Sequence, residues 1–299
     1  MNYFTALSLI LASQVSRFTL FMGLVDFILN LAALLLWLNW RSLRFDPLGQ
    51  RKPATLIGTL RRAEPQRLRH WHLLAAIGGL LLVRAGFYWQ IGLVSKPVWA
   101  GTLDLGMIAP SFLSNSFGRM CLFSICSFGL MLAVFHLWLL LLSILAGPEP
   151  VHGLVRMQLG VADRWPRWLK WVMPFTAAGL LWWLASWLLE WCGIIPTAVS
   201  MAHRVEQSVL LGLGSYLVWK YVVGVLLALH LLNSYVYLGR HPFWHYVNAT
   251  ARTLLQPLRR VPLRAGRVDF APVLGLVLVF LLAGLAERGL RSIYGRLPF

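Results

Sequence analysis

Charge is scarce in this chain, and acidic side chains are the scarcest of the charged groups. Only 12% of the 299 residues are charged, against about 25% in a typical soluble domain, while 59% are hydrophobic. The 10 acidic residues face 27 Lys and Arg residues, for a formal net charge of +17. This composition excludes an ordinary soluble protein. In so apolar a chain, excess basic charge is typical of cytoplasmic loops and lipid phosphates rather than of nucleic-acid binding.

Cysteine and the common catalytic motifs are also lacking. The three cysteines, Cys121, Cys126 and Cys192, lie in or beside apolar runs without zinc-site spacing, so we expect buried thiols and no disulfide framework. The chain has no Walker loop, dinucleotide-binding glycine motif, His-Glu-x-x-His or serine-hydrolase elbow, so we expect no enzyme. No basic segment precedes the first apolar stretch, which argues against a cleaved secretory signal.

Long apolar runs are what the sequence has in abundance. A helix needs ~20 apolar residues to cross a bilayer. Six runs are long enough: 17–40, 71–94, 119–146, 168–195, 207–238 and 270–290. Residues 3–15 are too few to span, and we expect an interfacial or half-buried lead-in to the first helix. The predicted fold is an all-α integral membrane protein of about six transmembrane helices.

Basic residues are concentrated in three of the connecting loops, 41–70, 147–170 and 239–269. The positive-inside rule therefore places these three loops in the cytoplasm and both termini on the far side. The end of the chain departs from this rule, because Arg288, Arg291 and Arg296 would then lie outside.

A spacing recurs along the chain. His136 lies twelve residues before Pro148, and His230 lies twelve residues before Pro242. We predict three units of helix, interfacial segment and helix at 17–118, 119–206 and 207–299, after the lead-in of 1–16. Repeats in membrane proteins often indicate transporters. These repeats run in the same direction and we expect no interrupted pair of half-helices, which argues against transport.

Charged residues inside membrane helices are candidate functional residues, here Asp26, Arg84, Glu190 and Lys220. They could form ion pairs between helices or belong to a proton or ion path. Asp26 and Arg84 each lie ~14 Å below the outer boundary at 1.5 Å per residue, so we expect them to pair. Asn30, one turn after Asp26, could complete the hydrogen bonding, and Lys220 is the competing partner for Asp26.

Two histidines offer a different chemistry. His136 and His230 occupy matching repeat positions at similar depth, and two neutral imidazoles could ligate the iron of a haem b. The alternative is that each histidine hydrogen-bonds to a neighbouring helix, as polar groups in membranes commonly do. No other metal site is indicated.

Residues 241–274 form the most distinctive stretch. Because the residue before a proline is pushed out of the α region, Pro242 ends the preceding apolar run, and residues 243–255 form a short amphipathic helix. One face of that helix carries Phe243, Val247, Thr250 and Leu254, whereas Asn248 and Arg252 lie off it. Asp269 is expected to cap the last helix and Pro272 to lie in its first turn.

This stretch resembles the YggT family of small bacterial and plastid membrane proteins. The resembling residues are Pro242, the segment Pro257, Leu258, Arg259 and Arg260, and the later Gly266, Asp269 and Pro272 ahead of a final membrane helix. The match covers about the last 60 residues of the chain. His241 and Ala271 stand where the family usually has Asn and Ser.

The resemblance implies a non-enzymatic accessory or scaffold protein of the bacterial inner membrane. Such proteins are associated with envelope and division organisation, osmotic-stress tolerance and assembly of membrane complexes. The expected partners are anionic membrane lipids and other membrane proteins, and no nucleic acid. Two alternatives remain open: a small-solute or ion transporter or channel, and a haem-binding membrane subunit of a respiratory or photosynthetic complex.

Overall fold

The computed structural model describes residues 22–42, 70–94, 99–145, 152–198, 200–236, 242–260, 264–265 and 268–296. Within this part, six helices are long and apolar enough to cross a membrane, which confirms the all-α multi-pass fold. They are the helix Met22–Ser42, α3 (His70–Val94), α4 (Phe117–Leu145), α6 (Arg167–Trp191), the rod Met201–Tyr235, and α10 (Ala271–Tyr294). The lead-in at residues 3–15 and most of the first basic loop lie outside the described residues.

By their contacts, the described residues within 1–99 and 113–132 form one compact unit, and those within 100–112 and 133–299 form another. These units are defined by contacts and do not test the three sequence repeats, which stay a prediction. In the first unit, Ala33, Ile77 and Phe128 meet at the centre, one from each of three helices: Met22–Ser42, α3 and the first part of α4. Opposite faces carry exposed apolar side chains such as Phe27 and Val83, as helices surrounded by lipid require.

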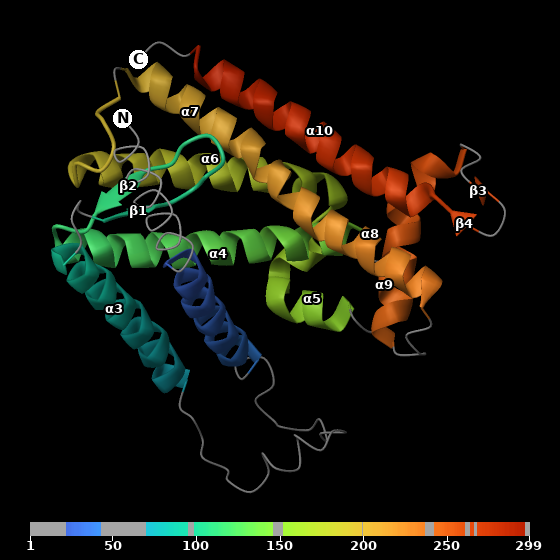
Figure 1. Cartoon of the computed structure of the whole chain (residues 1–299), viewed down its shortest axis with the longest axis horizontal. Helices are drawn as coiled ribbons and strands as arrows, with labels where there is room; N and C mark the ends of the chain where they lie inside the picture. The colour runs from blue at the N-terminus through green and yellow to red at the C-terminus, as the bar shows by residue number, and fades with distance from the viewer. Residues whose placement is uncertain are drawn as a thin grey trace, which may run out of the picture. The chain divides into compact units, whose positions relative to one another are not determined.

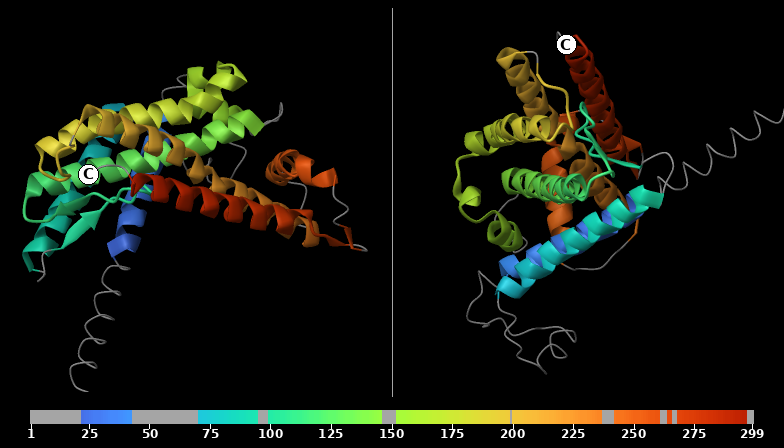
Figure 2. Two further views of the ribbon diagram at one scale, coloured as in Figure 1. Left: turned by 90° about the horizontal axis from the view of Figure 1, so that it is seen from above. Right: turned by 90° about the vertical axis from the view of Figure 1, so that its left-hand side faces the viewer.

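The second unit is built from two pairs of long helices (Figure 1). α6 packs against α7 (Met201–Gly214), and α10 packs against α8 (Trp219–Tyr235). The 3-10 segment η3 (Ser215–Val218) joins α7 to α8 in one rod, and α10 runs antiparallel beside that rod (Figure 2).

Shorter elements connect these helices. The segments α5 (His152–Leu159) and η2 (Gly160–Arg164) precede α6, and α9 (Pro242–Leu254) and η4 (Gln256–Arg260) follow α8. Both connections therefore consist of a short α-helix followed by a 3-10 turn. The strands β3 (Arg264–Ala265) and β4 (Val268–Asp269) lead into α10, and β1 (Ala100–Thr102) and β2 (Ser111–Leu113) form a hairpin before α4.

Glycine allows α6 and α7 to approach closely. A Cβ at Gly212 of α7 would lie 2.7 Å from the carbonyl oxygen of Phe175, and one at Gly179 of α6 would lie 3.0 Å from that of Ser208. A different glycine ends α6: Gly193 has φ of +63°, and Ile194 N–H donates to the Leu189 carbonyl over 2.9 Å. This is the left-handed helix end that glycine favours, and it turns the chain toward α7.

The predicted amphipathic helix is α9, and it packs against protein. Ala251 and Leu255 are buried with Leu227 of α8. Of the face predicted from the sequence, Val247 and Thr250 are buried, Leu254 is half-buried and Phe243 is 42% exposed. The buried face is rotated toward Ala251 and Leu255, because α9 lies against α8 rather than against lipid alone.

The start of α10 also differs from the sequence expectation. Phe270, not Asp269, occupies the N-cap position, and no side chain caps the helix. Asp269 lies instead in β4, where its backbone stands opposite that of Arg264 in the antiparallel pairing with β3. Pro272 lies in the first turn of α10, as expected, since the missing N–H of proline would have no partner in a first turn.

Candidate functional site

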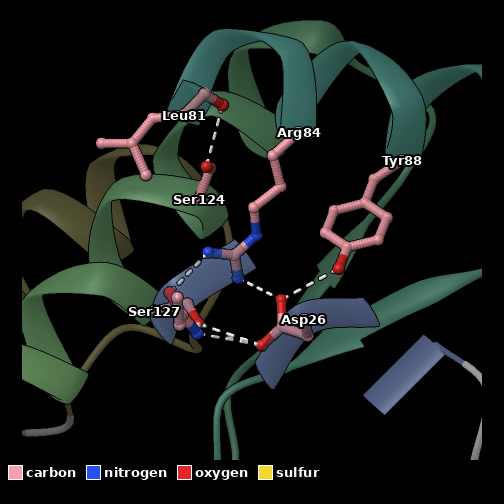
Figure 3. A network of polar contacts seen from close by, with 7 residues as sticks. Asp26, Leu81, Arg84, Tyr88, Ser124 and Ser127 are labelled. Atoms are coloured by element: carbon pink, nitrogen blue, oxygen red, sulfur yellow. Dashed lines mark hydrogen bonds and ion pairs between the residues drawn. The ribbon is translucent and has the colours of Figure 1, made fainter. Parts of the chain in front are cut away.

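The most highly connected polar site in the described residues is centred on Asp26. The Arg84 guanidinium of α3 forms a salt bridge with Asp26 of the first helix, and Arg84 Nη1 donates to Asn30 Oδ1 over 2.7 Å (Figure 3). The Arg84 side chain is fully buried. This is the pairing that the equal depth of Asp26 and Arg84 predicted, with Asn30 in the expected role.

Further donors converge on the same carboxylate (Figure 3). Tyr88 OH donates to Asp26 Oδ1 over 2.9 Å, and Ser127 Oγ of α4 donates to Oδ2 over 3.2 Å. Asn30 Nδ2 donates to Oδ2 over 3.3 Å. With Arg84, four donors from three helices therefore hold both oxygens. Sequence reasoning missed Tyr88 and Ser127; the one signal available was the position of Tyr88, one turn after Arg84.

Aromatic rings cover the guanidinium of Arg84. Its central carbon lies 5.7 Å from the Tyr88 ring centre and 5.5 Å from the Phe123 ring centre. The Tyr88 ring in turn packs against Trp99 at 4.8 Å. A cation facing aromatic rings away from water gains electrostatic attraction. Arg84 thus has both a counter-ion and aromatic rings around its guanidinium. Both stabilise a buried charge that links two membrane helices.

A second ion pair lies where α6 meets α7. Arg204 Nη2 donates to Glu190 Oε2, and the Ala198 N–H donates to Glu190 Oε1 over 3.2 Å. The Arg204 guanidinium lies 4.0 Å from the Trp187 ring centre. The apolar run predicted for this span begins at residue 207, but α7 begins at Met201, so Arg204 lies inside the helix rather than in the loop before it.

A third ion pair joins α8 to α10. Lys220 Nζ donates to Glu287 Oε2 over 3.0 Å, and Arg291 Nη2 donates to Glu287 Oε1 over 2.7 Å. Arg291 Nε also donates to the Gly106 carbonyl over 3.1 Å. Lys220 thus has a partner other than Asp26, and sequence reasoning missed Glu287. The ion pair of Arg291 with Glu287 also offsets part of the positive charge at the end of the chain.

Next to Lys220, the rod contains a 3-10 segment between its two α-helical parts. Residues 215–218 form a 3-10 turn between two α-helices. Around this turn, Trp138 Nε1 of α4 donates to the Val218 carbonyl over 3.1 Å, and Trp219 Nε1 donates to the Leu137 carbonyl over 3.0 Å. An indole from each helix thus binds a carbonyl of the other. A 3-10 segment inside a helix often marks a functional site. Here the indole of Trp138 already occupies the Val218 carbonyl in that segment.

The two histidines lie on α4 and α8 as predicted. His230 Nδ1 lies 2.7 Å from Asn248 Oδ1 of α9, which is the hydrogen bond between neighbouring helices that we gave as the alternative to haem. The ring of His136 lies edge-on to Phe135, with ring centres 5.6 Å apart. Haem ligation by the pair is untested and stays a prediction.

The residues of the YggT-like pattern surround the connection from α8 to α10. Pro242 begins α9, while Pro257 to Arg260 lie in η4. Leu258 packs against the core of Leu227, Ala251 and Leu255. Gly266 lies outside the described residues, and only the backbone placement of Arg259 and Arg260 is described.

Comparison with known proteins adds no assignment. No protein-family model, curated protein or solved structure gives a significant match to this chain.

Proposed function

We propose that this chain is a non-enzymatic accessory or scaffold protein of the YggT type in the bacterial inner membrane. Its role is to organise a membrane complex, in envelope or division organisation, osmotic-stress tolerance or complex assembly. Its partners are anionic membrane lipids and other membrane proteins, and its three basic loops face the cytoplasm. It has no haem or other cofactor in this proposal.

The observation that supports this proposal is the pairing of the intramembrane charges. Asp26 with Arg84, Glu190 with Arg204, and Lys220 with Glu287 all form ion pairs between helices. A proton or ion path needs a group that can release one partner and take another, whereas four donors hold Asp26. Paired charges of this kind fasten helices to one another, which is what a scaffold requires.

The connection from α8 to α10 supports a docking role for the YggT-like segment. α9 is fixed against α8 by Ala251 and Leu255, and by the His230 to Asn248 contact. The segment η4 follows directly and carries Pro257, Leu258, Arg259 and Arg260. Two adjacent arginines on a fixed turn beside a membrane helix are suited to an acidic segment of a partner protein or to lipid phosphates.

Crosslinking in intact membranes, followed by quantitative mass spectrometry, tests the proposal. The wild-type chain should recover at least one membrane protein in stoichiometric amount. Arg259→Gln with Arg260→Gln should reduce that recovery several-fold. Arg252→Gln, which removes a single charge from the exposed side of α9, should leave it unchanged. Proteoliposome measurements of proton or solute flux complete the test.

Two results would contradict the proposal. Flux that depends on Glu287 or Asp26, with no stoichiometric partner, would favour a transporter. A haem absorption spectrum that His230→Ala abolishes would favour the cofactor-binding alternative. An unchanged partner set in the double arginine variant would remove η4 as the docking segment.

A further inference from the structure

The short connection before α6 buries its acidic residue. The side chain of Asp163 in η2 is 4% exposed, and Ser143 Oγ of α4 donates to its Oδ1 over 2.6 Å. Lys170 Nζ donates to Ser143 Oγ and to the Asp163 backbone carbonyl, each over 2.7 Å, and lies 3.7 Å from Asp163 Oδ1. Since the Lys170 side chain is 7% exposed, these opposite charges offset one another beneath the surface.

The arginines of the same connection remain outside. Arg156 has a side chain 67% exposed, and its Nε donates to Asp163 Oδ2 over 3.2 Å, so the buried acid also positions this guanidinium. Arg164 and Arg167 are exposed, one directly after Asp163 and one four residues later. Asp163 is the one acidic residue between 152 and 171. Over the described residues 152–171, the exposed surface therefore carries three positive charges and no negative one.

Apolar side chains accompany these charges. Trp168 in the first turn of α6 is 67% exposed, and Val161 of η2 is 74% exposed. α6 is a membrane-spanning helix that begins at Arg167, so these residues lie where the span starts. Tryptophan and arginine at that level are suited to the boundary between phosphate headgroups and acyl chains.

We propose that Arg156, Arg164, Arg167 and Trp168, the α5–α6 basic patch, bind the phosphate headgroup of an anionic phospholipid in the adjoining leaflet. Arginine donors match phosphate oxygens in geometry and charge. The exposed faces of Trp168 and Val161 favour a lipid over free phosphate, because a free anion would leave them in water. This inference deepens the lipid part of the proposed function and rests on it.

Binding of phosphatidylglycerol to the purified full-length chain in detergent micelles, counted by native mass spectrometry, tests the patch. The variant R156Q/R164Q/R167Q should lose affinity by about fivefold per arginine, or on the order of 100-fold in all. R156K/R164K/R167K should keep most of the affinity, because the charge remains. R252Q/R288Q/R296Q removes equal charge from exposed positions elsewhere and should change binding at this site little.

Four results would overturn the inference. They are unchanged binding in the glutamine variant, equal loss in the control variant, equal affinity for phosphatidylcholine, or displacement of the lipid by millimolar inorganic phosphate. The last result would indicate a site for a soluble phosphate. Because purified protein is used, failure here leaves the crosslinking test of the partner proposal unaffected. Loss of a partner protein in the glutamine variant, with lipid binding intact, would instead assign the patch to a protein.

Discussion

Arg84 and Asp26 form an ion pair in which the arginine is fully buried and the carboxylate side chain is 26% exposed. The two helices that carry them are far apart in sequence, and the ion pair holds them together at one level of the membrane. Ser127 of α4 binds the same carboxylate, so a single acid joins three helices. A lone charge at this depth is unfavourable by ~2.5–3.5 kcal/mol on insertion scales, which explains why the pair is completed so fully.

The close approach of α6 and α7 predicts a strong effect of one added methyl group. Gly212→Ala places a Cβ 2.7 Å from the Phe175 carbonyl, so it should destabilise the protein by about 1–3 kcal/mol. Gly284→Ala on α10 is the matched control, because nothing lies within 4 Å of its Cβ position. Thermal unfolding in detergent should show a lower Tm for Gly212→Ala and an equal or higher Tm for Gly284→Ala. Equal losses would contradict the close approach.

Glu287 is shared by Lys220 and Arg291, and this predicts which substitution in the third ion pair lowers stability most. Glu287→Gln leaves two cations, Lys220 and Arg291, without their counter-ion, whereas Lys220→Met leaves Glu287 paired with Arg291. Glu287→Gln should therefore lower the Tm more, with a loss on the order of 1–3 kcal/mol. Lys220→Arg, which keeps the charge, should be nearly neutral. A larger loss from Lys220→Met than from Glu287→Gln would show that Arg291 does not share the acid.

The packing of α9 predicts which of its positions tolerate charge. Leu255 is 6% exposed against Leu227, Leu254 is half-buried, and Arg252 is exposed. Burying a leucine contributes ~1.5–3 kcal/mol, and a buried carboxylate adds a desolvation penalty. Protein accumulation in membranes should fall most for Leu255→Asp, less for Leu254→Asp and least for Arg252→Asp. Equal accumulation of all three would mean that α9 is a solvated segment.

The proposed orientation predicts a labelling pattern in intact cells. Cysteines introduced at Gln66 and Arg264, in the basic loops, should resist a membrane-impermeant thiol reagent, and one at Pro97 should react. Gln66 and Pro97 lie outside the described residues, so the side of the membrane predicted for each rests on the loop charges alone. Each variant is compared with its own fully permeabilised sample. Reaction at Gln66 without permeabilisation would reverse the orientation.

The six spans could be predicted because bilayer thickness fixes the length of an apolar helix. The Asp26 to Arg84 contact followed from depth, since a buried charge needs a partner at its own level. Depth alone could not reveal the role of Ser127, because serine is common in membrane helices and its partner depends on how α4 is rotated. Glu287 was missed for a related reason: it lies close to Arg288 and Arg291, and the charges there suggested a helix end.

The helix boundaries and the 3-10 segment of the rod depended on contacts beyond the local sequence. Polar residues before 207 hid the first turns of α7, where Arg204 is stabilised by Glu190 and Trp187. The 3-10 turn at residues 215–218 follows Gly212 and Gly214, but glycine alone does not distinguish a break from a close helix contact. The hydrogen bonds of Trp138 and Trp219 join two different helices, and the hydrophobic periodicity of one helix does not predict such contacts.

A double-mutant cycle on Asp26 and Arg84, read by thermal unfolding of the purified protein, tests the central claim that the intramembrane charges fasten helices together. Asp26→Asn should destabilise the protein by about 3–5 kcal/mol, because it leaves the fully buried Arg84 without a counter-ion. Arg84→Gln should destabilise it less, because the Asp26 side chain is 26% exposed and keeps three other donors. The double variant should lose clearly less than the sum of the two, with a coupling of about 1–3 kcal/mol. Tyr88→Phe, which removes one hydrogen bond from the same carboxylate, should cost only about 1 kcal/mol. Strict additivity of Asp26→Asn and Arg84→Gln would contradict the ion pair, and with it the claim that paired charges fasten these helices together.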